Sequence, residues 1–203
     1  RGLGDVYKRQ NKQKKSTFHI SVFNDHKNAW HPPTLWIGLG CERNTSKKLI
    51  EDSLQDFLIT NNLSPLSIAG FATIDLKKDE QAILKISKEN KWPIKFFTSE
   101  ELSKINVPNP SNIVLNEIGT PSVAEAACIM AAGEGSKLLK EKKIFKSLDS
   151  SKSTSGAVTI AVAESKKQYS PSIGEIHIVG SGPGDISYLT NDARKALSKC
   201  SIS

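Results

Sequence analysis

The sequence predicts an α/β domain in which a mainly parallel sheet is covered by helices. Short β-rich runs alternate with segments whose apolar residues recur at helical spacing, as in strand–helix–strand units. The runs end in glycine or polar residues, which are common where a strand turns into a loop. This alternation spans residues 34–163, so we expect one domain there, between linkers at residues 16–33 and 164–173.

The first half of this region predicts three strands, each followed by a helix. The strands are expected at residues 34–40, 67–72 and 94–97. Thr45 or Ser46 can cap the first helix, since each carries a side-chain oxygen that accepts a hydrogen bond from a backbone amide. The buried face of that helix is expected to consist of Leu49, Ile50, Leu54, Phe57 and Leu58, which recur at helical spacing.

The second half predicts a helix with a small buried face and a final strand. The helix is expected at residues 119–132, with Pro121 at its first position, where a missing amide is tolerated. Its buried face, which permits close packing, is expected to consist of Ala124, Ala127, Cys128 and Ala131. Residues 137–146 are basic and amphipathic, residues 147–155 are a Ser-rich link, and residues 156–163 are an uncharged, β-rich last strand.

The positive charge of the chain lies mainly outside the expected domain. The 203 residues carry a formal charge of +7. Residues 1–15 form a basic tail with six Lys/Arg and one Asp, whereas residues 34–163 hold 16 Lys/Arg and 15 Asp/Glu. A nucleic-acid-binding domain would carry such charge on a folded face, so we expect no nucleic-acid partner. Residues 1–10 resemble translated sequencing-adapter DNA and are left out of the fold prediction, with a natural basic arm as the alternative.

The cysteine and histidine content disfavours disulfide and metal sites. Cys41, Cys128 and Cys200 are far apart and form no Cys-x-x-Cys pair, which fits a reducing cytoplasm. The four His residues form neither a catalytic triad nor a metal-ligand spacing, so we expect no metal. We also expect no membrane partner, because no apolar run approaches 18 residues.

Polar residues that follow the predicted strands are the candidates for a functional site, because open α/β sheets bind ligands beyond the carboxyl ends of their strands. These loops contain a guanidinium, an ammonium, hydroxyls and helix starts, all of which can donate hydrogen bonds to an anion. Together they suit a substrate with many carboxylates. The predicted substrate-binding residues are Arg43, Thr45, Ser46, Lys78, Thr120 and Ser122, with Lys77 as an alternative point charge. Glu80 and Glu125 are the candidate catalytic bases. Capping and surface chemistry is the alternative interpretation of each of these residues.

Four blocks of the expected domain resemble one known family. They are Gly38-Leu-Gly-Cys-Glu-Arg-Asn-Thr-Ser46, Ala72-Thr-Ile-Asp-Leu-Lys-Lys-Asp-Glu80, Phe97-Thr-Ser-Glu-Glu-Leu102 and Gly119-Thr-Pro-Ser-Val-Ala-Glu-Ala-Ala127. In this order they are similar to the CobE/GbiG C-terminal domain, which forms the C-terminal part of cobalt-precorrin-5A hydrolase in cobalamin biosynthesis. The resemblance implies that the partner is a cobalt-precorrin or another corrinoid intermediate.

The end of the chain resembles a second family. Its motif is Gly174-Glu-Ile-His-Ile-Val-Gly-Ser-Gly-Pro-Gly-Asp185, followed by a helix-like segment with Leu189, Ala193 and Leu197 on one face. Residues 174–203 are similar to the first strand, turn and helix of the tetrapyrrole methyltransferases, which use S-adenosyl-L-methionine. The resemblance implies a cofactor-cleft turn at Gly180, Gly182, Pro183, Gly184 and Asp185, and a homodimer formed through the complete methylase domain.

Together the two resemblances imply a bifunctional cobalt-precorrin-5A hydrolase/precorrin-3B C(17)-methyltransferase. One strand and one helix cannot bury a core, so we expect the chain to be a piece of that enzyme and inactive alone. The alternatives are a non-catalytic corrinoid-binding module and a structural spacer in the same pathway.

Overall fold

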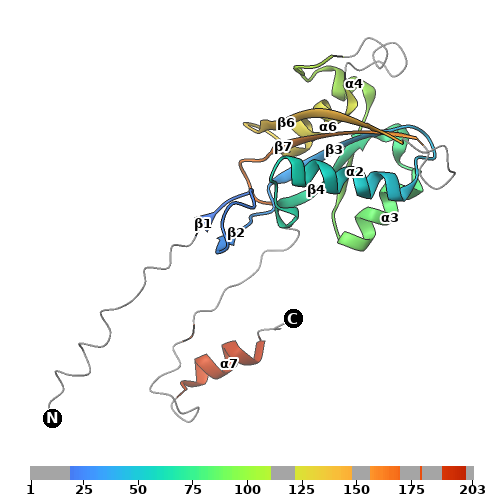
Figure 1. Ribbon diagram of the computed structural model, residues 1–203. Coiled ribbons are helices and arrows are strands. Elements are labelled where there is room, and N and C mark those ends of the chain that lie inside the picture. Colours follow the sequence, from blue (N-terminus) through green and yellow to red (C-terminus); the bar gives the residue numbers. More distant parts are fainter. Residues whose placement is uncertain (1–18, 111–121, 148–155, 170–178, 180–188, 200–203) are drawn as a thin grey trace, which may run out of the picture. The chain divides into compact units, whose positions relative to one another are not determined.

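The computed structural model describes residues 19–110, 122–147, 156–169, 179 and 189–199 (Figure 1). The chain divides into two compact units, residues 1–169 and residues 170–203. The first unit contains a five-stranded sheet with helices on both faces. Among the described helices, none is long and apolar enough to cross a membrane.

The sheet has the strand order β5-β4-β3-β7-β6. Its strands are β3 (Leu35–Cys41), β4 (Ile68–Ile74), β5 (Ile94–Phe97), β6 (Lys137–Lys146) and β7 (Ala157–Glu164). The predicted class, an α/β sheet covered by helices, is confirmed. Parallel pairing holds only from β5 through β4 to β3, whereas β7 is antiparallel to both β3 and β6. The difference arises because residues 137–146 form a strand that pairs with β7 as a hairpin.

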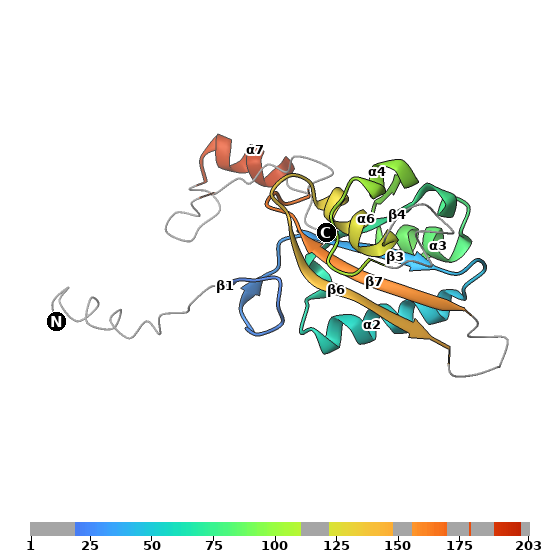
Figure 2. The same ribbon diagram turned by 90° about the horizontal axis from the view of Figure 1, so that it is seen from above.

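Two helical layers cover the sheet, with α2 (Lys47–Thr60) on one face and α6 (Val123–Ala132) on the other (Figure 2). Helix α3 (Gln81–Asn90) packs with α2, and the short α4 (Ser99–Ser103) packs with α6. The α2 side holds a core of large side chains, including those predicted for the first helix. The α6 side is built largely from alanine, as the sequence predicted.

Helix α6 packs directly on the central strand because a row of small residues crosses the sheet there. Gly38 on β3 lies in register with Ala72 on β4 and Ala161 on β7. A Cβ atom added at Gly38 would lie only 1.9 Å from the carbonyl oxygen of Ala124. The first turn of α6 is therefore held against the middle of β3.

Local signals explain where the helices begin. Ser46 caps α2, its hydroxyl accepting a hydrogen bond from the Leu49 amide at 3.2 Å. Thr98 and Glu101 form a reciprocal capping box at the start of α4. Two 3₁₀ turns, η2 (Pro65–Ser67) and η3 (Asp75–Lys77), flank β4.

The stretch expected as the first linker contains a small parallel sheet. Its strands are β1 (His19–Ile20) and β2 (Ala29–Trp30). Val22, between them, is buried in the α2-side core, and Phe23 forms an isolated bridge with Leu63. Residues 19–30 thus contribute packing to the first unit.

The second unit is described mainly by helix α7 (Asn191–Lys199). Its first turn receives a side-chain cap, since the Thr190 hydroxyl accepts a hydrogen bond from the Ala193 amide at 3.2 Å. The helix overlaps the helix-like segment predicted after the glycine-rich motif and extends to Lys199. The predicted turn from Gly180 to Asp185 lies outside the described residues.

Candidate functional site

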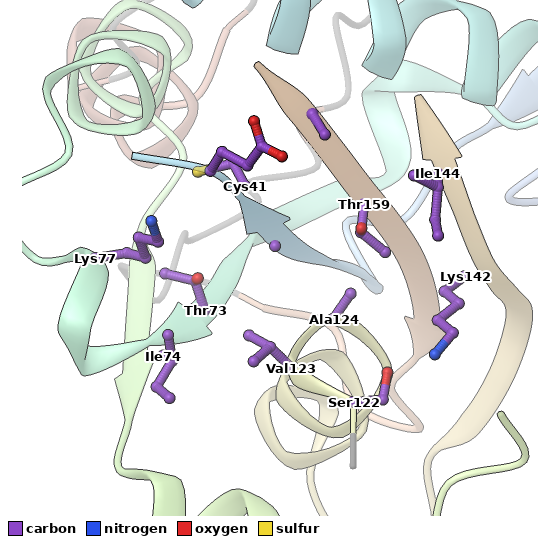
Figure 3. Close-up of a pocket in the computed structure, with 13 residues that line it drawn as sticks. Cys41, Thr73, Ile74, Lys77, Ser122, Val123, Ala124, Lys142, Ile144 and Thr159 are labelled. Carbon is purple, nitrogen blue, oxygen red and sulfur yellow. The ribbon is translucent and has the colours of Figure 1, made fainter. Parts of the chain in front are cut away.

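A cavity of about 280 Å³ opens at the carboxyl edge of the parallel strands (Figure 3). Four parts of the fold form it: the ends of β3 and β4, the turn η3, the start of α6, and the β6–β7 hairpin. The lining residues are Gly40, Cys41, Glu42, Thr73, Ile74, Lys77, Ser122, Val123, Ala124, Lys142, Ile144, Ala157 and Thr159.

The sheet topology brings these segments to one edge. Parallel β3 and β4 both end here, as expected for ligand sites in open α/β sheets. Because β7 is antiparallel to β3, its first residues meet the last residues of β3, and Gly40 pairs with Thr159. Thr159 in turn pairs with Ile144 of β6. The hairpin thus forms a wall of the cavity that the parallel strands alone would not provide.

Two ammonium groups lie on opposite sides of the cavity (Figure 3). The Lys77 side chain is only 11% exposed, and its Nζ lies 3.9 Å from Glu80 Oε2, too far for a hydrogen bond. Lys142 Nζ donates one hydrogen bond, of 2.5 Å, to the carbonyl oxygen of Asn109. An ammonium has three donors, so both lysines retain N–H groups without an acceptor among the described residues.

The start of α6 adds to the positive potential of the cavity. Ser122 occupies the N-cap position and is buried, but its hydroxyl makes no capping hydrogen bond. The first amides of a helix lack intrahelical partners and carry the positive end of the helix dipole. With Lys77 and Lys142, this helix start favours a bound carboxylate or another anion.

The remaining lining residues are mainly neutral. The Thr73 hydroxyl donates to the carbonyl oxygen of Leu39 at 2.7 Å. Burial raises the pKa of the Cys41 thiol to about 11, so the thiolate nucleophile is scarce at neutral pH. Ile144 is 58% exposed at the cavity and offers apolar surface. Glu42, which is exposed, is the one carboxylate among the described lining residues.

Of the predicted substrate-binding residues, Ser122 lines this cavity. Arg43 does not, because its exposed guanidinium donates to Asp79 Oδ1 at 2.5 Å and to the Leu76 carbonyl oxygen at 2.7 Å. Thr45 is buried and donates to the Glu42 carbonyl oxygen at 2.8 Å, and Ser46 serves as the cap of α2.

Lys78 is exposed and does not line the cavity, whereas its neighbour Lys77 does. Lys77, which the sequence offered as the alternative to Lys78, is thus the lysine whose side chain lines the cavity. Thr120 lies outside the described residues.

The two candidate bases anchor backbone segments. Glu80 Oε1 accepts from the Asn44 amide at 3.1 Å and thereby holds the loop after β3. Glu125 Oε1 accepts from the Lys142 amide at 3.1 Å and from Asn109 Nδ2 at 3.0 Å. Neither carboxyl group lines the cavity. Among the described residues, no group of three or more His, Cys, Asp or Glu is placed to hold a metal ion.

The cavity residues of the hairpin, namely Lys142, Ile144 and Thr159, were not predicted from the sequence. Five lysines in residues 137–146 concealed the strand, since lysine is depleted in strands. A usable signal was present, because glycines 133 and 135 precede this segment and a β-rich run follows it, which is typical of a hairpin.

Comparison with known proteins links this fold to cobalamin biosynthesis. Cobalt-precorrin-5A hydrolase of Priestia megaterium is 33% identical over 134 residues, covering 66% of this chain and 33% of the hydrolase. Protein CobE of Sinorhizobium sp is 30% identical over 110 residues, covering 53% of this chain and 71% of CobE. A crystal structure of CobE, a protein from the cobalamin (vitamin B12) biosynthetic pathway, matches with a TM-score of 0.54 and 28% identity. That match covers 64% of this chain and 89% of the CobE chain.

The chain spans about one third of the length of the hydrolases it matches, 33% for the Priestia megaterium protein and 30% for that of Salmonella typhimurium. The family described as Cobalamin synthesis G C-terminus matches residues 35–163, which confirms the resemblance of the four sequence blocks. That match does not include residues 174–203, for which the methyltransferase resemblance stays a prediction. With most of its length matched, the chain belongs to the Cobalamin synthesis G C-terminus family.

Proposed function

We propose that the domain binds the carboxylate side chains of a cobalt-precorrin, as part of an enzyme of the cobalt-precorrin-5A hydrolase type. The observation that carries the proposal is the pair of ammonium groups, Lys77 and Lys142, facing one cavity at the start of α6. The family and the named relatives support the choice of substrate class.

The size of the cavity supports binding of a side chain and not of the whole macrocycle. Pockets for drug-sized ligands measure about 300–1,000 Å³, and a corrinoid ring is larger than most such ligands. A cavity of about 280 Å³ accommodates an acetate or propionate arm. The ring then lies across the mouth, where exposed Ile144 offers apolar contact.

The same arrangement suits the chemistry that the resemblance to cobalt-precorrin-5A hydrolase implies, in which water opens a δ-lactone on the macrocycle and a two-carbon fragment leaves as acetaldehyde. Opening a δ-lactone with water develops negative charge on the acyl oxygen, and donors fixed before the reaction stabilise that charge. Lys77, Lys142 and the first amides of α6 are such donors. Water addition also requires a base, and the described lining offers Glu42 for this role.

A second candidate function is binding without catalysis. The CobE match favours this function, because it covers 89% of the CobE chain. CobE, a protein of the cobalamin biosynthetic pathway, therefore consists of little more than this fold. In that case the domain holds or hands on the corrinoid, and the chemical step belongs to another part of the enzyme.

Residues 174–203 lie outside the matched family and carry a separate proposal. We propose that they begin a tetrapyrrole methylase domain, which uses S-adenosyl-L-methionine and dimerises only when complete. The placement of α7 after the glycine-rich motif supports this proposal. The test is S-adenosyl-L-methionine binding by the product of the whole reading frame, and absence of binding there would refute it.

The carboxylate proposal is tested by calorimetric titration of the chain with cobyrinic acid and with its heptamethyl ester. We expect the acid to bind at least tenfold more tightly, by about 1.4 kcal/mol. Lys77→Met and Lys142→Met should each weaken binding of the acid about tenfold, again about 1.4 kcal/mol. Lys143→Met is the matched control, since Lys143 is exposed on β6 and pairs with Asp56 at 3.0 Å. Equal affinities for acid and ester would refute the proposal.

Release of acetaldehyde from cobalt-precorrin-5A separates the two candidate functions. If Lys77→Met lowers the rate at saturating substrate, the domain takes part in the chemistry. If Lys77→Met weakens corrinoid binding but leaves the rate at saturating substrate unchanged, the binding function is favoured. This comparison uses the product of the whole reading frame, because the chain alone is expected to be inactive. Variants that raise only the concentration needed for half-maximal rate also point to binding.

A further inference from the structure

Glu125 lies in the first turn of α6 and is completely buried. A buried carboxyl group costs free energy unless its oxygens are hydrogen-bonded. Its Oε1 accepts two hydrogen bonds, whereas Oε2 has no partner among the described residues. An apolar side chain would fill this position without that cost, which points to a role for the bonds made by Oε1.

One of these bonds fixes an irregularity in β6. The register between β6 and β7 shifts between Lys140 and Lys143, as at a β-bulge. The amide of Lys142 lies within this shift and donates to Glu125 Oε1 at 3.1 Å. Bulges redirect side chains next to functional sites. Here the residue at the bulge is the lysine that lines the cavity.

The second bond closes a ring of contacts around Lys142. Asn109 Nδ2 donates to Glu125 Oε1 at 3.0 Å, and the Asn109 carbonyl oxygen accepts from Lys142 Nζ at 2.5 Å. Both the backbone and the side-chain tip of Lys142 are therefore tied, directly or through Asn109, to one carboxyl oxygen. Glu141 Oε2 is an additional, exposed acceptor for Asn109 Nδ2 at 2.9 Å.

We propose that Glu125 is a positioning residue, which directs the Lys142 ammonium into the cavity by holding the β6 bulge and the Asn109 loop. The inference rests on the proposed function, in which Lys142 binds a carboxylate of the corrinoid. It replaces the role of general base that the sequence suggested for Glu125. The carboxyl group acts through Lys142 and does not itself touch the ligand.

A double-mutant cycle on the full chain tests this role, with cobyrinic acid as the probe. Lys142→Met should weaken binding about tenfold and Glu125→Ala by a similar factor, consistent with the coupling of neighbouring groups. The double variant should bind no more weakly than Lys142→Met alone. Glu125→Gln should stay within about twofold of the parent, because its amide oxygen accepts the same two hydrogen bonds.

Two further variants guard against a general loss of structure. Glu141→Ala is the matched control, because it removes the exposed acceptor of Asn109 and should leave affinity unchanged. Asn109→Ala substitutes for Glu125→Ala if that variant does not fold, since it breaks the ring in a half-buried loop. It should weaken binding about threefold, and this effect should vanish in the Lys142→Met background.

The outcomes separate failure of this inference from failure of the proposed function. If Glu125→Ala weakens binding equally with and without Lys142, or has no effect, the positioning role is refuted while carboxylate binding stands. If no lysine variant affects binding, the proposed function fails. Amide exchange at Lys142 then decides the positioning role. Exchange should quicken in Glu125→Ala but not in Glu125→Gln, and unchanged exchange in both would overturn it.

Discussion

The parallel and antiparallel halves of the sheet supply one cationic side chain each, but they hold it differently. In the parallel half, Lys77 follows β4 in a 3₁₀ turn and lies near the buried carboxyl group of Glu80. In the antiparallel half, Lys142 sits at a bulge and bonds a neutral carbonyl group. The comparison shows that the cavity is a property of the junction, because neither half alone surrounds a ligand.

The junction depends on the close approach of α6 to β3, and its largest test is Gly38→Ala. The new Cβ would lie 1.9 Å from the carbonyl oxygen of Ala124, so the helix has to move. Overpacking of this kind typically costs about 1–3 kcal/mol, and we expect about 3 kcal/mol here because the obstacle is backbone. Urea unfolding measures the change.

Gly40→Ala is the matched control for Gly38→Ala. It lies on the same strand, and its added Cβ would approach Thr159 Cβ no closer than 3.5 Å, an ordinary contact. We expect an effect within about 0.5 kcal/mol, as for substitutions without a steric conflict. Equal losses for the two variants would show that close packing of α6 does not set this position.

The same division explains how much of the fold the sequence could predict. The parallel half follows from local signals, since Ser46 and Thr98 cap their helices and residues 94–97 form the predicted strand. In the antiparallel half, β7 also follows from its β-rich composition, whereas β6 forms because pairing with β7 outweighs the low strand propensity of its lysines. Lysines on an edge strand such as β6 also protect it from pairing with other chains, so their charge is compatible with a strand.

The candidate site was harder to predict because side-chain direction is not a local property. Sequence placed the polar residues after the correct strands, and Ser122 lines the cavity. It did not distinguish Lys77 from Lys78, which differ only in the direction that η3 gives them. Lys142 was missed because its position depends on a bulge and on Glu125, an acid that resembles an ordinary first-turn helix residue.

The two lysines have different partners, a carboxyl group for Lys77 and a neutral carbonyl group for Lys142, so their substitution should affect stability differently. Lys77→Met leaves the Glu80 carboxyl group buried without its nearest cation, and we expect a loss of about 2 kcal/mol, below the range for tighter buried pairs. Lys142→Met removes one hydrogen bond to a carbonyl group and should cost about 1 kcal/mol. Urea unfolding of both variants tests the order.

Glu80→Gln provides the control for the larger loss. In the Lys77→Met background it removes the uncompensated acid but keeps an oxygen acceptor for the Asn44 amide, so it should restore most of the stability. If the double variant remains as unstable as Lys77→Met, the loss has another cause and the contrast between the two halves disappears.

Cys41, at the end of the strand shared by both halves, reports the polarity of the junction. Burial raises the pKa of its thiol from 9.0 to about 11. At pH 8 this shift lowers the thiolate fraction of the folded chain about 100-fold relative to the unfolded chain. A more basic thiolate is also a better nucleophile, which offsets about tenfold of that loss. Reaction with 2-hydroxyethyl disulfide should therefore be about tenfold slower in the folded chain. Peptide mass spectrometry of the folded and urea-unfolded chain measures the ratio at this residue.

The pH dependence of that reaction has a definite sign. The unfolded thiol should reach half its maximal rate near pH 9 and level off above pH 10, whereas the rate of the folded thiol should still rise steeply between pH 10 and pH 11. Because the folded pKa is the higher one, ionisation favours unfolding, and the associated stability is lost as pH rises from about 9 toward 11. A folded-state rate that levels off by about pH 10 would contradict a desolvated junction.

The smallest expected effects belong to Arg43 and Lys78, exposed cations near the cavity that do not line it. Arg43 is already paired with Asp79, and charges exposed to solvent are screened by salt. Arg43→Met and Lys78→Met should therefore change the affinity for cobyrinic acid by less than about twofold, and only at low ionic strength. If either weakens binding as much as Lys77→Met, the ligand lies outside the junction. The anion site would then be formed by the loops after β3 and β4 that the sequence first suggested, and the antiparallel half would have no part in recognition.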